Sequence, residues 1–351
     1  MAAPERPLAV VNSVAPIRIC DIGGWTDTWF AGHGQVFNLA VYPFAEAQVA
    51  IHAARVGAPR LMIHAENFAE RYEVRHQAPP WGPHPLLEAA IAYMKVPRDL
   101  RLDVTIHSDA PPGAGTGTSA AVTVALIGAL DALTPGRLTP DEVARAAQRV
   151  ETEMLGRQCG IQDQIASAYG GINYIEMFDY PHASVSPVLV PDPIWWEFER
   201  RLVLVYLGRS HDSSAIHEEV IRTLQEAGPD SRAIADLRRH APHARDALYA
   251  GDFQALGRSM IESTEAQGRL HSALIGAEAR KVIEIAKAHG ALGWKVNGAG
   301  GEGGSLTLLC GESSERKRAL IREIEQSSEA FRSIPIYLSR HGLRVWRQDL
   351  G

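Results

Sequence analysis

The residues of this chain best suited to hold a phosphate lie between positions 111 and 121. The segment is Pro-Pro-Gly-Ala-Gly-Thr-Gly-Thr-Ser-Ala-Ala, and the Ala/Val/Leu run after it predicts a buried helix. Glycine admits positive φ and lets a ligand approach the backbone closely. Thr118 and Ser119 stand where a helix N-cap is expected, and a helix N-terminus offers free N–H groups to an anion. Taken alone, the segment fits a nucleotide phosphate loop and a glycine-rich turn equally well.

Two acidic residues further along the chain could complete such a site. Glu151 and Asp163 are separated by twelve positions, and Asp163 belongs to the segment Cys-Gly-Ile-Gln-Asp-Gln at 159–164. Phosphoryl transfer needs one carboxylate to take the proton of the attacking hydroxyl and another to hold the Mg²⁺ that neutralises the phosphates. By themselves, the residues favour an exposed helix face for Glu151. They leave Asp163 open between a catalytic base and a helix cap.

A third group of polar residues follows the first apolar, β-branched run of the chain. Arg18 ends this run, and the segment Asp-Ile-Gly-Gly-Trp-Thr-Asp follows at 21–27. An arginine beside a catalytic carboxylate would keep it ionised and stabilise developing charge. Carboxylates on a glycine turn, such as Asp27, are well placed to accept hydrogen bonds from sugar hydroxyls. The alternatives are a surface ion pair for Arg18 and an ordinary turn residue for Asp27.

A second glycine cluster, at 298–304, follows Lys295. It matches Gly-x-Gly-x-x-Gly, but residues 305–309 predict a strand, whereas a dinucleotide site needs a helix directly after the glycines. The sequence Gly-x-x-x-x-Gly-Lys-Ser/Thr does not occur, so a P-loop fold is excluded. The cluster is then a glycine hairpin beside a phosphate or substrate, or a tight turn without a ligand, and its own residues favour the turn.

Composition limits the class of protein. The 351 residues are 46% hydrophobic, which is enough for two domains, and the net charge of −6 argues against a nucleic-acid partner. The three cysteines are widely spaced and predict neither a disulfide framework nor a zinc site. The first residues lack the pattern of a signal peptide, and no uncharged run is long enough to cross a bilayer. We therefore expect a cytoplasmic protein with no membrane partner.

The elements that must position these residues are mixed strands and helices. Strands predominate over residues 8–76, and helices are expected at 86–94, at 119–133 and from a capping box at Thr139 to about residue 155. A Pro-Asp-Pro linker at 191–193 precedes a mostly helical second half. Because strands and helices do not alternate regularly, we expect an α+β fold. The expected domains are residues 1–192 and 193–351.

In their order and spacing, the three motifs resemble those of the GHMP kinases, a family of small-molecule kinases that includes galactokinase, homoserine kinase and mevalonate kinase. The motifs are residues 15–27, 111–121 and 295–304, and the acidic segment at 159–164 lies between the last two. The resemblance implies an N-terminal domain like ribosomal protein S5 and a ferredoxin-like C-terminal domain, with the active site between them. It also implies ATP and Mg²⁺ as the nucleotide and the metal.

The resemblance implies a role for each matching residue. Asp163 would be the catalytic base and Arg18 its partner, while Ser119 and Glu151 would hold Mg²⁺. The sugar would contact Asp21, Gly24, Asp27, Gly300 and Gly301. The ATP phosphates would contact Pro112, Gly113, Ala114, Gly115, Thr116, Gly117, Thr118 and Ser119. Thr116 and Thr118 replace the usual Leu and Ser, which should be tolerated, whereas Glu302 interrupts a run that is usually all glycine.

The first motif, Gly-Gly-Trp-Thr-Asp at 23–27, is most similar to the fucokinase and heptose 7-phosphate kinase branch of the family. It implies phosphorylation of the anomeric hydroxyl of a hexose or heptose, which could already carry a phosphate. The alternatives are a kinase of the galactose or mevalonate type, or a sensor that binds ATP and a sugar without catalysis. Adenine is expected near residues 36–85. The partner would be a sugar or sugar phosphate, and a homodimer is compatible with the family.

Overall fold

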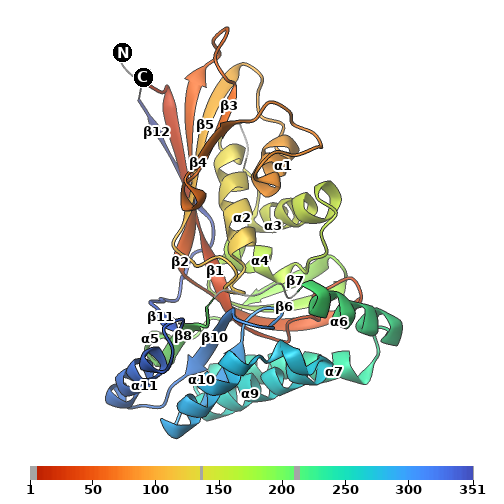
Figure 1. The fold of residues 1–351 in the computed structure, drawn as a ribbon, viewed down its shortest axis with the longest axis vertical. Helices are drawn as coiled ribbons and strands as arrows, with labels where there is room; N and C mark the ends of the chain where they lie inside the picture. The colour runs from red at the N-terminus through yellow and green to blue at the C-terminus, as the bar shows by residue number, and fades with distance from the viewer. Residues whose placement is uncertain (1–5, 135–136, 209–213, 351) are drawn as a thin grey trace.

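The chain is organised around a mixed sheet of eight strands (Figure 1). The computed structural model describes residues 6–134, 137–208 and 214–350. The strand order is β12-β1-β2-β5-β3-β4, and β6 pairs with both β2 and β7. The strands are β1 (Ala9–Ile22), β2 (Gly34–Ala53), β3 (Leu61–Ala65), β4 (Glu70–Glu73), β5 (Leu100–Ser108), β6 (Ile172–Asp179), β7 (His182–Pro187) and β12 (Arg344–Asp349).

Four helices pack on one side of this sheet: α1 (Pro85–Tyr93), α2 (Thr118–Asp131), α3 (Pro140–Arg149) and α4 (Gln162–Tyr169). The apolar run predicted as a buried helix forms α2, whose side chains from Val124 to Leu130 are all buried. The capping box predicted at Thr139 is confirmed, because its hydroxyl accepts from the N–H of Glu142 and the Glu142 carboxylate accepts in return. The helix continues beyond α3 in a π-helical turn, Val150–Met154.

The second half of the chain builds a smaller sheet of four strands in the order β11-β8-β10-β9. Its strands are β8 (Leu202–Tyr206), β9 (Gly293–Val296), β10 (Ser305–Leu309) and β11 (Arg332–Ile334). The helices of this half are α5 (Asp192–Arg201), α6 (Ser214–Ala227), α7 (Arg232–Arg238), α8 (His240–Tyr249), α9 (Phe253–Leu270), α10 (Ala277–Ala288) and α11 (Ser314–Ser327). The α+β class is confirmed.

The chain returns to the first sheet at its end, because β12 pairs antiparallel with β1 from Val14 back to Ala9. The boundary expected after residue 192 falls at the first residue of α5, and the last strand belongs to the large sheet. The two sheets are therefore tied together by more than the connection at 191–193.

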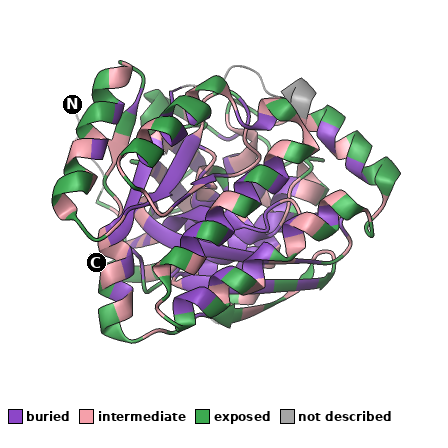
Figure 2. Cartoon of the chain, turned by 90° about the horizontal axis from the view of Figure 1, so that it is seen from below, coloured by how far each residue is buried: buried purple, intermediate pink, exposed green. Residues whose placement is uncertain are grey.

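One hydrophobic cluster joins the two halves. It contains Ile19 and Phe37 from the large sheet together with Phe198, Leu248 and Leu256 from the second half, all of them fully buried. In Figure 2 the buried residues form one continuous band through the centre of the molecule. Burial of large side chains stabilises a fold by roughly 1.5–3 kcal/mol each. The residues placed on either side of this junction are therefore held in fixed positions.

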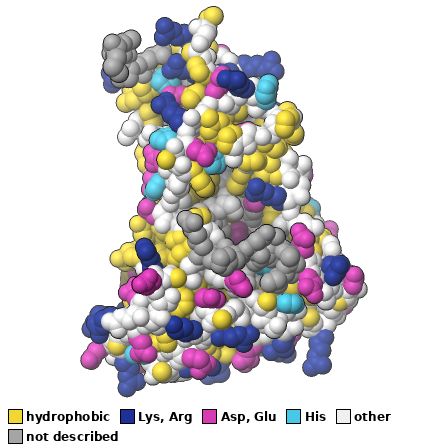
Figure 3. All heavy atoms as spheres, viewed as in Figure 1, with side chains coloured by type: hydrophobic (Ala, Val, Ile, Leu, Met, Phe, Trp, Pro, Cys, Tyr) yellow, Lys and Arg dark blue, Asp and Glu magenta, His cyan; other side chains and the backbone are white. Residues whose placement is uncertain are grey.

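Among the described residues, no helix is both long enough and apolar enough to cross a bilayer. Basic and acidic side chains are interspersed over the face shown in Figure 3. The described side chains on this face thus form no single basic surface of the kind that nucleic-acid binders carry.

Candidate active site

The segment at 111–117 forms a loop that leads into α2. Gly113, Gly115 and Gly117 all have positive φ, at 73°, 67° and 68°. Gly117 is the N-cap of α2 and supplies no side-chain hydrogen bond, so the expected capping role of Thr118 and Ser119 is wrong. These two residues open the helix instead, and the first N–H groups of α2 are left for a ligand. Such an uncapped helix N-terminus next to glycines is suited to a phosphate.

Arg18 and Asp163 form a two-point ion pair directly behind this loop. Arg18 Nε lies 2.7 Å from Asp163 Oδ1, and Nη2 lies 3.1 Å from Oδ2. Arg18 also donates to the carbonyl oxygen of Gly115. A Cβ added at Gly117 would lie 3.1 Å from the Asp163 carboxyl carbon, so the phosphate loop and the acid are in contact. The guanidinium thus fixes the position of the carboxylate and of the loop together.

Arg18 is 5% exposed, because β1 carries its side chain under the loop. Burial alone would lower the pKa of Arg18, but the carboxylates of Asp163 and Asp21 raise it above its ordinary value. Arg18 is therefore charged, as it must be to hold a carboxylate. The surface ion pair that the sequence left open for Arg18 is wrong.

Asp27 holds the helix that carries Asp163. Its Oδ2 accepts hydrogen bonds from the backbone N–H of Ile161 at 2.9 Å and of Gln162 at 3.0 Å, at the start of α4. Its Oδ1 accepts from the Gln162 side-chain amide at 3.4 Å, a longer hydrogen bond than the two at Oδ2. Burial raises the pKa of Asp27 to about 6. Asp27 thus acts as a cap for α4, and Oδ1 is the oxygen that remains able to bind a ligand.

Glu151 lies in the π-helical turn after α3 and is 7% exposed, so the exposed helix face that its surroundings favoured is wrong. Its Oε1 accepts from the side-chain amide of Gln164 at 2.9 Å. Burial raises the pKa of Glu151. A π-helical turn shifts the direction of the side chains that follow it and is frequent at functional sites. Here the π-helical turn contains Glu151, which is buried.

The third motif meets the phosphate loop backbone to backbone. A Cβ added at Gly298 would lie 2.9 Å from the carbonyl oxygen of Gly115, and a Cβ added at Gly115 would lie 2.9 Å from that of Asn297. Ser305 Oγ donates to the carbonyl oxygen of Ala114 at 2.6 Å. Both glycines are thus required by the close approach of the two loops.

Asn297 and Asp21 connect this contact to β1. Asn297 Oδ1 accepts from the backbone N–H of Cys20 at 2.9 Å, and its amide donates to Ser305 Oγ at 2.9 Å. Asp21 is 1% exposed, and both its oxygens lie 3.1 Å from the backbone N of Gly298. The buried ammonium of Lys295 lies 3.8 Å from Asp21. We therefore assign Asp21 to holding the third motif, and its predicted sugar contact stays a prediction.

The three glycines predicted to contact the sugar, Gly24, Gly300 and Gly301, do not line either of the two cavities described below. A Cβ added at Gly24 would meet Asp21 Oδ2 at 2.7 Å, so Gly24 packs against that carboxylate. Gly300 packs against the carbonyl oxygen of Leu274, and Gly301 donates to that oxygen at 2.9 Å. Glu302 is exposed and has no positive φ, unlike the glycines around it. The interruption of the glycine run is therefore accommodated at the surface.

Two cavities meet at the Arg18–Asp163 pair. One, of about 610 Å³, is lined by the phosphate loop together with Phe68, His84 and Leu86. The other, of about 320 Å³, is lined by Asp27, Glu151 and a set of residues for which the sequence analysis predicted no role: Trp25, Trp29, Phe30, Gln158, Gln162 and His217. The walls of both cavities include Arg18, Ser119, Asp163, Gly298 and Ala299. Two ligands can thus meet at this point.

Some of the missed residues carried a usable signal. Trp25 and Trp29 lie in or next to the first motif, and Trp25 adopts φ 74°, a conformation that non-glycine residues rarely take outside constrained sites. Phe68 and His84 fall in the region expected to contact adenine. His217 lies on α6 in the second half of the chain, and nothing in its local sequence marks it.

Comparison with known proteins agrees with this geometry. The model of the GHMP kinase N-terminal domain matches residues 86–171, and the model of the GHMP kinase C-terminal domain matches residues 244–328. The heptose 7-phosphate kinase (D-glycero-alpha-D-manno form) of Campylobacter jejuni is 25% identical over 250 residues, which are 71% of this chain and 72% of that protein. The mevalonate kinase of Thermococcus sibiricus is 30% identical over 253 residues, 69% of this chain and 68% of that protein.

The fold also agrees with a crystal structure of a D-glycero-D-manno-heptose 1-phosphate kinase from Bacteroides thetaiotaomicron. The TM-score is 0.72 at 24% identity, covering 96% of this chain and 98% of that one. The family models, the relatives and the three motifs in contact around two cavities all lead to the same assignment. This chain belongs to the GHMP kinase family.

Proposed function

We propose that this protein transfers the γ-phosphoryl group of ATP to the anomeric hydroxyl of a hexose or heptose. The observation that carries the proposal is the meeting of two cavities at Asp163, one beside the phosphate loop and one beside Asp27. Such an arrangement holds the nucleotide and the acceptor on either side of a single carboxylate. Positioning and electrostatic stabilisation supply most of the catalysis in phosphoryl transfer.

The larger cavity suits ATP. Its phosphates would bind the N–H groups at the start of α2 and the glycine loop, where the helix dipole favours negative charge. Phe68 is 61% exposed and its ring lies 5.0 Å from that of His84, so the cavity offers aromatic surfaces to a purine ring. We assign adenine to this side, within and next to the region expected from the sequence.

The smaller cavity suits a sugar. Sugars present hydroxyl groups around a ring with less polar faces, and this cavity combines carboxylates with the aromatic rings of Trp25, Trp29 and Phe30. Asp27 Oδ1 is available to accept from a hydroxyl, as the first motif predicts. The carboxylate of Asp27 in the wall of this cavity supports a sugar acceptor over an isoprenoid alcohol.

Asp163 would act as the general base. As the acceptor oxygen attacks, the proton of its hydroxyl passes to an Asp163 carboxylate oxygen, a P–O bond forms to the γ-phosphorus, and the bond to the β,γ-bridging oxygen breaks. ADP leaves with the electrons of that bond. Each Asp163 oxygen accepts one hydrogen bond from Arg18 and keeps a lone pair for the proton. Arg18 orients the carboxylate and compensates its charge.

Ser119 and Glu151 are the residues that would hold Mg²⁺. Both line the smaller cavity, and their hydroxyl and carboxylate oxygens are the hard ligands that Mg²⁺ prefers, with substrate phosphates completing its shell. The buried Glu151 carboxylate has a neutral amide as its hydrogen-bond partner, so a cation would compensate its charge. The residues therefore fit the metal. When bound, Mg²⁺ neutralises charge on the phosphates as the transfer proceeds.

A substrate screen tests this function. ADP release is measured with ATP, Mg²⁺ and a panel of hexoses, 6-deoxyhexoses, heptoses, heptose 7-phosphate and mevalonate. We expect turnover with a sugar and loss of its reducing end, because a phosphate on the anomeric oxygen blocks ring opening. Turnover with mevalonate alone would refute a sugar acceptor, and a product that keeps its reducing end would refute the anomeric position. Sugar and ATP binding without turnover would indicate the sensor alternative.

A further inference from the structure

His217 brings a residue of the second half of the chain into the smaller cavity. It lies on α6, and its Nε2 is 3.2 Å from the carbonyl oxygen of Gly300 in the third motif. A carbonyl oxygen only accepts, so Nε2 carries the proton of this hydrogen bond. Burial lowers the pKa of His217, so the ring is neutral at neutral pH. Its Nδ1 is then a hydrogen-bond acceptor.

This acceptor belongs to a residue that lines the smaller cavity. Within the described part of the chain Nδ1 has no hydrogen-bond partner, and it is not among the polar atoms enclosed by protein. The ring packs edge-on against Trp25, with centroids 6.0 Å apart and planes at 75°. Turning the ring to exchange its nitrogens would break the bond to Gly300. The bond to Gly300 and the contact with Trp25 thus determine which ring nitrogen of this cavity-lining residue is the acceptor.

We propose that His217 is a specificity-determining residue whose Nδ1 accepts a hydrogen bond from a sugar hydroxyl other than the one that is phosphorylated. The proposal rests on the proposed function and deepens it. A neutral imidazole Nδ1 requires a donor, and a hydroxyl is one, whereas a phosphate oxygen or a deoxygenated carbon is not. The acceptor sugar therefore has a free hydroxyl at the position that faces α6. Any phosphate that it already carries lies elsewhere on the sugar.

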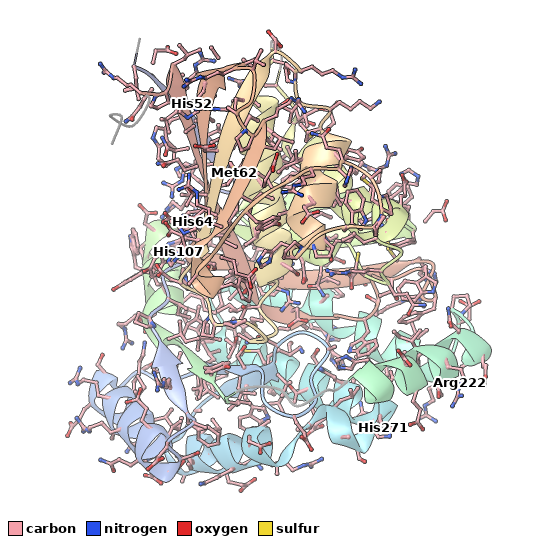
Figure 4. The ribbon with its side chains drawn as sticks, turned by 45° about the horizontal axis from the view of Figure 1, so that its top comes forward. His52, Met62, His64, His107, Arg222 and His271 are labelled. Carbon is pink, nitrogen blue, oxygen red and sulfur yellow. The ribbon has the colours of Figure 1, made fainter. Side chains whose placement is uncertain are left out.

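Two amide variants separate this role from a structural one. In His217→Asn, Oδ1 takes the place of Nδ1, but the side chain is too short to reach Gly300. In His217→Gln, the amide nitrogen takes the place of Nε2 and keeps the bond to Gly300, but it offers no acceptor at the Nδ1 position. Arg222→Ala is the matched control, because Arg222 is exposed on the same helix, pointing away from the cleft (Figure 4).

The readouts are KM for the best sugar, KM for ATP and kcat. We expect H217Q to raise the sugar KM about tenfold, the loss of one hydrogen bond of roughly 1.4 kcal/mol, with the ATP KM within about twofold of wild type. The sugar KM of H217N should stay closer to that of the wild type, and R222A should leave all three parameters unchanged. A higher sugar KM for H217N than for H217Q would overturn the proposal and leave His217 as a support for Gly300 alone. A sugar KM equal to wild type in both variants would also overturn it.

Monodeoxy sugars complete the test as a cycle between enzyme and substrate. One analogue should lose about tenfold in kcat/KM with the wild type and show no further loss with H217Q, because both changes remove the same bond. If every analogue loses equally with both enzymes, the proposal is wrong while the sugar kinase activity stands. A wild type that phosphorylates no sugar overturns the proposed function and this inference with it.

Discussion

Replacing Asp163 by Asn separates the chemistry of the site from its architecture. The side chain keeps its shape, but it loses its charge and its ability to take a proton. The amide oxygen can still accept from Arg18 Nε, which now donates at 2.7 Å. The amide nitrogen would face Nη2, where a carboxylate oxygen now accepts at 3.1 Å. One hydrogen bond of the pair is thus kept, and the other becomes a contact between two donors.

Two magnitudes follow from this geometry. Loss of a general base lowers kcat by about 10²–10⁴-fold, which is about 2.7–5.4 kcal/mol of barrier. Arg18 stays charged at 5% exposure with a weakened partner. Breaking a fully buried pair costs about 3–5 kcal/mol and an exposed one about 1 kcal/mol or less. Because the Asp163 side chain is 29% exposed, we expect the free energy of unfolding to fall by about 1–3 kcal/mol.

The assay is steady-state ADP release with the best sugar, together with urea unfolding of the same preparations. Asp141→Asn is the matched control, because Asp141 also accepts from an arginine Nε at 2.7 Å, in the α3 pair with Arg145, which is more exposed than the Arg18–Asp163 pair. D141N should keep the wild-type kcat and lose less than about 1 kcal/mol of stability. A folded D163N with kcat within about threefold of wild type would refute Asp163 as the base.

Three further predictions concern the metal, the contact between the loops and pH. Glu151→Gln should raise the Mg²⁺ concentration for half-maximal activity about tenfold or more, and an unchanged Mg²⁺ titration would exclude Glu151 as a ligand. Ser305→Ala removes the hydroxyl that donates to the Ala114 carbonyl oxygen at 2.6 Å. The free energy of unfolding should therefore fall by about 1–3 kcal/mol, and the KM for ATP should rise. Unchanged urea unfolding would contradict this prediction. Burial raises the pKa of Asp27 from 3.8 to about 6, so the folded protein binds this proton more tightly than the unfolded chain. Stability should therefore fall by about 2 kcal/mol as pH rises from about 4 to about 6. Urea unfolding at both pH values should show this fall in wild type and not in D27N, and an equal fall in both would assign it to another group.

Features encoded over a few residues could be predicted from the sequence. The capping box at Thr139 depends on residues three apart, and it forms as expected. The buried helix after the phosphate loop follows from an uninterrupted apolar run, and it forms α2. The three motifs could be assigned to one family because their order and spacing are more specific than any one of them. Prediction succeeded where the physical cause is local.

Partners that are distant in sequence could not be predicted. Asp27 caps α4 by accepting from backbone groups 134 and 135 residues away, and no local pattern distinguishes such a cap from an ordinary turn residue. Thr118 and Ser119 were expected as caps because hydroxyl residues usually take that position, but Gly117 takes it with a positive φ. Glu151 was expected at the surface, and the structure places it in a buried π-helical turn.

The contact between the two glycine clusters changes the reason for which glycine is needed in both. A glycine run near a phosphate is usually explained by N–H groups that face the ligand. Here Gly115 and Gly298 must both be glycine because the two loops are in contact: a Cβ on either residue would lie 2.9 Å from a backbone oxygen of the other loop. The same junction includes Asn297, which links β1 to Ser305, and Asp21, which holds Gly298. Since Arg18 fixes Asp163 and also bonds to Gly115, a shift between the two sheets would displace the base and the phosphate loop together.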